Sequence, residues 1–337
     1  MQAYGAVAVA PWRVEYLPVD VPDPGPEDVV IDVTHSWISN GTEGSFVRGE
    51  RIGGDTPRRD TDPMPFPHVP GYQKVGVVLG TGEDVSRVKQ GDSVFATVSR
   101  VNGMFYDHGG HVSPAVTHQS QVWPLPAGLY PVSASGLVLL QVGYNAGTCS
   151  ALKHGDRAVV IGDGMVGQWT AQTLQHRGAR VLMLGRHDYR LQLLDIRPED
   201  RRINVVADDP VLAVKQWAPD GIQMIVDTVG SIEMLESLYP TAQRFTRLVS
   251  AGFYGENGRI DIQTMRNYEM TLHSPSGWTS ERMDATLGLL ADGSLKTTHL
   301  ITHRFPISKV QQAFDLVLSK REPVLGVILD WQAGDAV

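Results

Sequence analysis

Residues 158–167, AVVIGDGMVG, decide the fold of the second half of the chain. The apolar run AVVI is typical of a strand buried in a parallel sheet, and the glycines after it have the spacing G-x-G-x-x-G. Gly162 permits a tight turn, Gly164 lets the backbone approach a pyrophosphate, and Gly167 allows a helix to pack closely on the strand. A segment with helical character follows at 166–177. The stretch therefore predicts a strand–turn–helix unit that binds a dinucleotide.

The helix after this loop is expected to contribute to the same site. Its first residues, Met165 and Val166, present backbone N–H groups that have no acceptor inside the helix, and the helix dipole adds positive charge there. Phosphate groups bind readily at such an end. A glycine-rich turn in an unrelated α/β domain is the alternative interpretation. The strand before the loop and the helix after it favour the dinucleotide site.

Similar apolar runs recur along the chain beyond the loop, separated by segments with helical periodicity. The runs lie at 181–184, 203–206, 222–226, 247–251 and 270–273. Strands that alternate with helices predict a doubly wound parallel sheet. A mostly apolar segment at 132–145 precedes the loop and predicts a single buried helix.

The second strand of such a unit ends where NAD and NADP are distinguished. An acidic residue there would hold the ribose 2′-hydroxyl of NAD, but this strand ends in Gly185, Arg186 and His187. Gly185 leaves room for a phosphate, and positive partners for it are available in Arg186, His187 and Arg190. Asp188 lies past the position expected for the ribose ligand. The sequence therefore favours NADP(H), and the alternative is that these residues are solvated in a loop.

Residues 1 to about 130 have a different pattern, with short alternating runs punctuated by glycine and proline. This pattern predicts an antiparallel β domain. Two long loops interrupt the runs, at 40–70 and at 99–110. Loops of this length inside a compact domain are usually functional or disordered, so both are candidates for lining a site.

Length and composition exclude several classes of protein. The chain has 337 residues, enough for two domains with cores of their own. Its one cysteine, Cys149, excludes an internal disulfide and a cysteine-rich zinc site. A net charge of −8 with interspersed signs gives no broad basic face for nucleic acid. There is no signal-peptide pattern and no apolar run long enough to span a membrane, so we expect a cytoplasmic enzyme.

These features together resemble the medium-chain dehydrogenase/reductase superfamily along nearly the whole chain. Residues 69–78 look like its G-H-E-x-x-G-x-V segment, and residues 226–230 and 251–254 look like the turns after its fourth and fifth parallel strands. The resemblance implies an α/β fold in which a GroES-like β domain, at 1–130 and 295–337, holds an inserted Rossmann domain at 131–294. It also implies further cofactor contacts in the two turns, from Thr228, Val229, Gly230, Ala251, Gly252 and Phe253.

A closer resemblance is to bacteriochlorophyllide a dehydrogenase-like proteins. It rests on the pieces 38–43, 69–72, 251–254 and 302–304. Those proteins carry an acidic residue where this chain has Gly185 and Arg186. We therefore expect shared ancestry rather than a shared reaction, and the sequence does not define the substrate.

The zinc ligands of the superfamily have no counterparts at the matching positions. The first position holds Ser39 or Asn40, the second holds Tyr72 in place of histidine, and the third falls near Val138. These side chains are poor substitutes for thiolate and imidazole around Zn²⁺, so we expect no metal site. The remaining metal hypothesis uses loop residues whose spacing matches no known site: Glu43, His68, Asp107, His108 and His111.

A reaction without a metal needs a hydrogen-bond donor for the charge that develops on oxygen. We expect this donor to be Tyr72, whose alternative role is to fill the metal-sized space with its ring. Thr42 is expected to relay a proton, with capping of a turn as the alternative. Ser39 and Asn40 are expected to contact the substrate.

The sequence thus predicts a zinc-independent NADP(H)-dependent oxidoreductase that interconverts a secondary alcohol and a ketone. One alternative is an enoyl or quinone reductase, which reduces a conjugated C=C bond. Another is a non-catalytic relative that only binds the dinucleotide. The expected partners are a small alcohol or carbonyl compound and a second copy of the chain, which would form a homodimer through residues 269–278.

Overall fold

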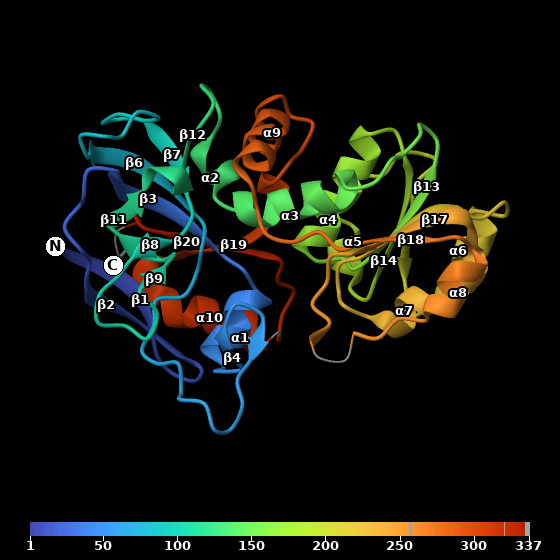
Figure 1. Ribbon diagram of the computed structural model, residues 1–337, viewed down its shortest axis with the longest axis horizontal. Coiled ribbons are helices and arrows are strands. Elements are labelled where there is room, and N and C mark those ends of the chain that lie inside the picture. Colours follow the sequence, from blue (N-terminus) through green and yellow to red (C-terminus); the bar gives the residue numbers. More distant parts are fainter. Residues whose placement is uncertain (256–257, 320, 334–337) are drawn as a thin grey trace. The chain divides into compact units, whose positions relative to one another are not determined.

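The computed structural model describes residues 1–255, 258–319 and 321–333. These residues form two compact units (Figure 1). The first unit comprises Met1–Val138 and the described chain from Thr297 onward, and the second comprises Leu139–Lys296. Within the described residues, no helix is long and apolar enough to cross a membrane.

The unit boundaries differ slightly from those expected at 130/131 and 294/295. Helix α2 (Pro131–Ala134) packs on strands β6 (Lys74–Thr81) and β7 (Ser93–Ala96), which keeps it in the first unit. The Thr297 hydroxyl donates a hydrogen bond of 2.7 Å to the Ser133 carbonyl oxygen. The chain therefore leaves and re-enters the first unit at neighbouring points.

The first unit is built mainly from antiparallel strand pairs, as expected, but the strands Ile301–Pro306 and Gly326–Asp330 pair in parallel. A three-stranded sheet has the order β10-β1-β2, and a larger sheet has the order β12-β7-β6-β3-β20-β19, with β11 also paired to β3. Their remaining strands are β1 (Gln2–Ala10), β2 (Arg13–Asp20), β3 (Asp28–Ile38), β10 (Val112–Ser113), β11 (Ala115–His118), β12 (Val122–Pro124), β19 (Ile301–Pro306) and β20 (Gly326–Asp330). Short pairs are formed by β4 (Arg51–Gly53) with β5 (Thr56–Pro57) and by β8 (Ser99–Arg100) with β9 (His108–Gly109).

Strand β20 returns the end of the chain to the core of the first unit. It pairs antiparallel with β3, with Val327 opposite Ile38 and Ile328 opposite Trp37. Helix α10 (Val310–Ser319) packs beside it through one apolar face. The first unit therefore contains residues from both ends of the given sequence.

The second unit is a parallel sheet with the order β15-β14-β13-β16-β17-β18, and every pair of neighbours is parallel. Its strands are β13 (Arg157–Ile161), β14 (Arg180–Gly185), β15 (Arg201–Asn204), β16 (Ile222–Asp227), β17 (Ala242–Ser250) and β18 (Thr271–His273). Its helices are α3 (Leu137–Thr148), which begins in the first unit, α4 (Met165–His176), α5 (Asp188–Leu191), α6 (Pro210–Trp217), α7 (Ile232–Ser237), α8 (Ile262–Asn267) and α9 (Ser280–Ala291).

Both faces of the parallel sheet are buried. Ala158 and Val160 of β13 belong to an apolar cluster with residues of α3 and α4, whereas Val159 and Ile161 belong to a second cluster with residues of α6 and α7. Alternation of side chains along a strand places these two sets on opposite faces. The doubly wound parallel sheet is confirmed, and burial on both faces accounts for the continuous apolar run of β13.

Two expectations about local structure are wrong. The segment 132–145 is not one helix, because the chain is interrupted between α2 and α3 at Ser135 and Gly136. A Cβ on Gly136 would lie 2.9 Å from the Trp37 ring, so the chain passes the ring at a residue with no side chain. The expected loop at 40–70 contains helix α1 (Thr42–Val47) and the β4–β5 pair.

Candidate functional site

The glycines of the loop after β13 are required by close contacts. Gly162 has a φ of 115°, and a Cβ there would overlap the hydroxyl oxygen of Thr228. A Cβ on Gly167 would overlap the carbonyl oxygen of Gly162. These two glycines therefore allow the loop to fold against β16 and the first turn of α4.

Gly164 differs from its two neighbours because open space lies beside it. No atom lies within 4 Å of the position that its Cβ would take. Gly164 is also the N-cap of α4, and no side chain caps the helix at this end. Met165 and Val166 begin α4 directly after it. The open space beside Gly164 therefore adjoins a helix N-terminus that no side chain caps, which is the kind of place where a phosphate binds.

The carboxylate of Asp163 lies at the end of β14, although Asp163 itself belongs to the loop after β13. Its Oδ2 atom accepts hydrogen bonds of 2.8 Å from the backbone N–H groups of both Arg186 and His187. A Cβ on Gly185 would lie 2.5 Å from the same oxygen. Gly185 thus leaves room for a carboxylate from the neighbouring loop, and the end of this strand carries an acidic group.

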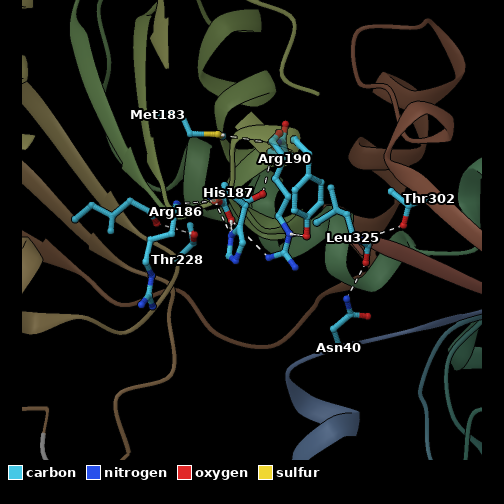
Figure 2. Close-up of polar contacts among 12 residues, drawn as sticks. Asn40, Met183, Arg186, His187, Arg190, Thr228, Thr302 and Leu325 are labelled. Atoms are coloured by element: carbon cyan, nitrogen blue, oxygen red, sulfur yellow. Dashed lines mark hydrogen bonds and ion pairs between the residues drawn. The ribbon is translucent and has the colours of Figure 1, made fainter. Parts of the chain in front are cut away.

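The three basic side chains expected at this turn have different environments. His187 Nδ1 lies 3.0 Å from Asp163 Oδ2, and Arg190 Nη1 lies 3.6 Å from Asp163 Oδ1. Arg190 also donates to the Tyr189 hydroxyl at 2.8 Å. The Arg186 side chain is exposed and points away from His187 and Arg190 (Figure 2). Among the described residues, the Arg186 guanidinium has no ion pair.

The turn after β16 is organised by a second buried carboxylate, Asp227. Its Oδ1 atom accepts hydrogen bonds from the N–H groups of Val229 at 2.8 Å and Gly230 at 3.1 Å, and its Oδ2 atom accepts one from the Tyr254 hydroxyl at 2.9 Å. The Thr228 hydroxyl donates to the Ile161 carbonyl at 2.8 Å. These contacts fix the turn beside the glycine loop.

The turn after β17 lies against the turn after β16. Gly230 has a φ of 91°, and a Cβ on Gly252 would overlap its backbone nitrogen. Val229 and Phe253 are each 47% exposed. Ala251 continues from β17 and is partly buried in the apolar cluster under α4. The two turns therefore offer an exposed apolar surface beside the glycine loop.

In the first unit, three hydroxyl groups meet at Tyr72. The Tyr72 hydroxyl donates a 2.7 Å hydrogen bond to the Ser39 hydroxyl oxygen. The Thr42 hydroxyl also hydrogen-bonds to Tyr72 and favours its ionised form. Burial is the larger effect and raises the pKa of Tyr72 to about 12, so the hydroxyl keeps its proton at neutral pH. Three of the four residues expected to act in catalysis thus form one hydroxyl cluster.

A buried polar chain supports this hydroxyl cluster from behind. The Glu43 carboxylate accepts a hydrogen bond of 2.8 Å from the Ser39 backbone N–H through Oε1, and its Oε2 atom lies 2.7 Å from His111 Nε2. His111 Nδ1 lies 2.8 Å from the Ser36 hydroxyl, which accepts from the Trp331 indole at 2.9 Å. With the imidazole proton on Nε2, every group in this chain is satisfied.

The backbone that carries Tyr72 is held by close crossing of two segments. Gly71 has a φ of 93°, and a Cβ there would lie 2.7 Å from His111 Nε2. The N–H groups of Gly110 and His111 both donate to the Pro70 carbonyl at 3.1 Å. Gln73, next along the chain, is buried and donates from its amide to the Trp37 carbonyl at 3.2 Å. The two long segments at 40–70 and 99–110 therefore meet at Tyr72.

Asn40 is not joined to the hydroxyl cluster by any described contact. Its amide nitrogen donates to the Leu325 carbonyl at 2.7 Å, and the Leu325 N–H donates to the Thr302 hydroxyl at 3.0 Å (Figure 2). The Asn40 Oδ1 atom is buried without a hydrogen-bond partner. Asn40 thus links the end of β3 to Leu325, just before β20, and through it to Thr302 of β19.

The loop residues of the residual metal hypothesis do not converge. Glu43 and His111 pair with each other in the interior. Asp107 and His108 form a separate, exposed pair, in which Oδ1 and Nδ1 lie 2.7 Å apart. His68 belongs to neither pair and lies among aromatic rings, with its Nδ1 atom 2.6 Å from a backbone carbonyl oxygen.

The residues expected in place of the superfamily's zinc ligands are Ser39 or Asn40, Tyr72 and Val138. Val138, at the third position, is a buried apolar residue, and Tyr72 and Ser39 offer only hydroxyl groups at the other two. Across the described part of the chain, no group of three His, Cys, Asp or Glu side chains is placed to hold a metal ion.

Sequence reasoning missed three features of these sites. Asp163 reaches the end of β14 from another loop, so the residues that follow that strand give no signal of it. The pairing of Glu43 with His111 joins residues from two loops and leaves no local signal either. Lys74 is fully buried, with its ammonium donating to the Thr97 carbonyl, and only its position inside an apolar run could have indicated this.

Comparison with known proteins agrees with this architecture. The family model described as the alcohol dehydrogenase GroES-like domain matches residues 25–127. A 2-desacetyl-2-hydroxyethyl bacteriochlorophyllide A dehydrogenase from Cereibacter sphaeroides is 25% identical over 352 residues, and the match covers 99% of each chain. The expected resemblance to this group of proteins is confirmed.

Two solved structures share the fold. A putative zinc-binding dehydrogenase from Sinorhizobium meliloti 1021, bound to NADP, has a TM-score of 0.80 at 18% identity, with 98% of this chain and 99% of that chain covered. A protein from Escherichia coli described as a short chain alcohol dehydrogenase, in complex with NADH, has a TM-score of 0.83 at 21% identity, with the same coverage.

The two-unit architecture, a GroES-like β unit and a doubly wound parallel sheet, is shared with these two solved dehydrogenases. The chain is similar to medium-chain dehydrogenases along nearly its whole length, and residues 25–127 match their GroES-like domain. The glycine loop of its second unit has the form that a dinucleotide cofactor requires.

Proposed function

We propose that the chain is a zinc-independent, NADP(H)-dependent oxidoreductase that interconverts a secondary alcohol and a ketone. The observation that carries this proposal is the hydroxyl cluster of Ser39, Thr42 and Tyr72. It stands at the position where zinc-dependent members have a metal ligand. A protonated phenol there can supply the hydrogen bond that a developing alkoxide needs.

In this proposal, Tyr72 touches the reacting oxygen. Because its pKa is raised to about 12, its hydroxyl remains a donor throughout the neutral range. The Thr42 hydroxyl donates to the Tyr72 oxygen and stabilises any negative charge left there when the proton moves. Ser39 accepts from Tyr72 in the free site and sets the direction of the hydroxyl. Asn40 remains a predicted substrate contact, through its unpartnered Oδ1 atom.

The cofactor would be held by residues of the second unit. The open backbone at Gly164 and the start of α4, Met165 and Val166, suit the pyrophosphate. The exposed apolar side chains of Val229 and Phe253 suit a flat ring. The bound nicotinamide supplies the hydride chemistry, which needs no metal.

For the adenosine ribose, we propose Arg186 as the ligand of the 2′-phosphate of NADP(H). Its guanidinium is exposed and without an ion pair among the described residues, whereas His187 and Arg190 lie beside Asp163. An arginine can bind a phosphate through two parallel hydrogen bonds. Of the three basic residues expected to bind the 2′-phosphate, Arg186, His187 and Arg190, the proposal keeps only Arg186.

A substrate panel with a metal assay tests the proposal. The purified protein is incubated with NADPH and with a series of ketones and conjugated enones, and its zinc content is measured by mass spectrometry. We expect alcohol products from ketones, no gain in rate from added zinc, and no loss of rate after chelation. Reduction of C=C bonds alone would assign the enoyl or quinone reductase class. Cofactor binding without turnover of any compound would favour the non-catalytic alternative.

We also propose a homodimer and a cytoplasmic location. Strand β18 ends the parallel sheet, and its Leu272 side chain is 39% exposed, so the edge and residues 269–278 are suited to pair with a second copy. Light scattering after size exclusion should give twice the chain mass of 36.8 kDa. Cell fractionation should recover the protein with soluble enzymes.

A further inference from the structure

The Asp163 carboxylate occupies the part of the second unit where cofactor choice is made. It is 5% exposed and accepts hydrogen bonds from the backbone N–H groups of Arg186 and His187. Backbone N–H groups can donate charge-assisted hydrogen bonds to a phosphate. Here both are already bound to a carboxylate.

Two basic side chains also lie beside the same carboxylate. His187 Nδ1 and Arg190 Nη1 lie 3.0 Å and 3.6 Å from its oxygens (Figure 2). The positive charge of Arg190 is thus balanced within the protein. Arg186 is left as the exposed cation of the turn.

A direct bond from Asp163 to the ribose hydroxyls of NAD(H) does not fit this arrangement. The carboxylate is almost completely buried, and both of its oxygens already face donors. An acidic ribose ligand at the end of the strand must instead present a free oxygen to solvent. Asp163 therefore acts on the cofactor through the residues that it binds.

We propose that Asp163 is a specificity-determining residue that limits the preference for NADP(H) over NAD(H). Its carboxylate occupies two N–H groups and Arg190, which are then not available to the 2′-phosphate, and it places a negative charge near that phosphate. Discrimination between NADP(H) and NAD(H) therefore depends on Arg186. This inference rests on the proposed binding of NADP(H). It also predicts that the preference increases when the carboxylate is neutralised.

Calorimetric titration with NADP⁺ and NAD⁺ tests this inference without a substrate. The quantity compared is the ratio of the dissociation constant of NAD⁺ to that of NADP⁺. In Asp163→Asn, the ratio should rise by about three- to tenfold, because a charge-assisted contact is released toward the phosphate. The matched control is Asp188→Asn, which removes an exposed carboxylate of the same turn that accepts from Asn204. Its ratio should change by less than about twofold, because water screens exposed charges.

A second pair of variants decides the question if Asp163→Asn does not fold. Arg186→Ala should lower the ratio by about tenfold or more, whereas Arg190→Ala should change it by less than about twofold. Equal losses in these two variants would overturn the inference. So would an unchanged or lower ratio in Asp163→Asn, including equal weakening of both cofactors. If the wild-type protein binds NAD⁺ more tightly than NADP⁺, the proposed cofactor is wrong. That result is distinct from a failure of this inference, which concerns only the change in the ratio that Asp163→Asn produces.

Discussion

His111 Nε2 and Glu43 Oε2 lie 2.7 Å apart in the interior of the first unit, although 68 positions separate the two residues in the sequence. Both side chains are almost completely buried. Glu43 also accepts from the backbone of Ser39, so this pair fixes one wall of the hydroxyl cluster. A buried carboxylate is costly unless each oxygen has a donor, and here each has one.

Removing one member of this pair should strongly destabilise the first unit. We expect Glu43→Ala to lower the free energy of unfolding by about 3–5 kcal/mol, because it leaves the His111 and Ser39 donors unpaired. Urea denaturation measures this value. The matched control is Glu27→Ala, whose partner His118 is exposed and 3.4 Å away, and which should cost less than about 1 kcal/mol. If the two variants lose the same free energy of unfolding, the buried pair of Glu43 and His111 is not the source of the stability.

The role of the Tyr72 hydroxyl is separable from that of its ring. Tyr72→Phe keeps the ring and removes the donor, so we expect kcat for a ketone to fall by about 10²–10³ with little change in melting temperature. Thr42→Val should produce a smaller fall of about tenfold, because it removes only the second hydrogen bond. Full activity of Tyr72→Phe would mean that the ring merely fills the space of a lost metal.

Lys74 should make the stability of the protein depend on pH above neutrality. Burial lowers the pKa of its ammonium from 10.5 to about 7, so between these values the unfolded chain binds one more proton than the folded chain. Stability attributable to Lys74 therefore rises with pH, by about 1.4 kcal/mol per unit at most. Lys74→Met lacks this pH-dependent contribution. Its free energy of unfolding should exceed that of the wild type most near about pH 7, and the difference should shrink toward about pH 10. Urea titrations at several pH values measure it, and a constant difference would contradict the assignment.

His68 should act on stability at acidic pH. Burial among aromatic rings lowers its pKa from 6.5, so the folded state keeps the ring neutral while the unfolded state takes up a proton. Stability is therefore lost as the pH falls through about 6.5. The variant His68→Phe should lose less stability than the wild type between about pH 7.5 and about pH 5.5. Thermal unfolding in matched buffers tests this, and parallel curves would rule out His68 as the titrating group.

The parallel sheet and its glycine loop could be predicted because their signals are local. An apolar strand, the glycine spacing after Ile161 and a helical segment lie within a few turns of chain, and each residue constrains its neighbours. The position of Asp163 could not be predicted in the same way. Its partners, Arg186 and His187, follow another strand, and only the parallel register of β13 and β14 brings them together.

The hydroxyl cluster could be anticipated from a motif rather than from spacing. The resemblance assigns Tyr72 and Ser39 to the positions of metal ligands, and the structure joins their two hydroxyl groups by a hydrogen bond. The residues behind them could not be anticipated, because Glu43 and His111 are isolated polar residues in two long segments. Burial of such residues depends on tertiary packing, which periodicity does not report.

The link from Asn40 to Leu325 has a consequence for the order of synthesis. Ser39 and Tyr72 leave the ribosome early, but β3, which leads into Ser39, pairs with β20 at residues 327–330. The second unit, in contrast, is one continuous stretch, Leu139–Lys296, and can complete its sheet while the chain is still growing. A nascent chain would thus complete its parallel sheet before β20 has been translated, and the strand that leads into the hydroxyl cluster would gain its last pairing partner only afterwards.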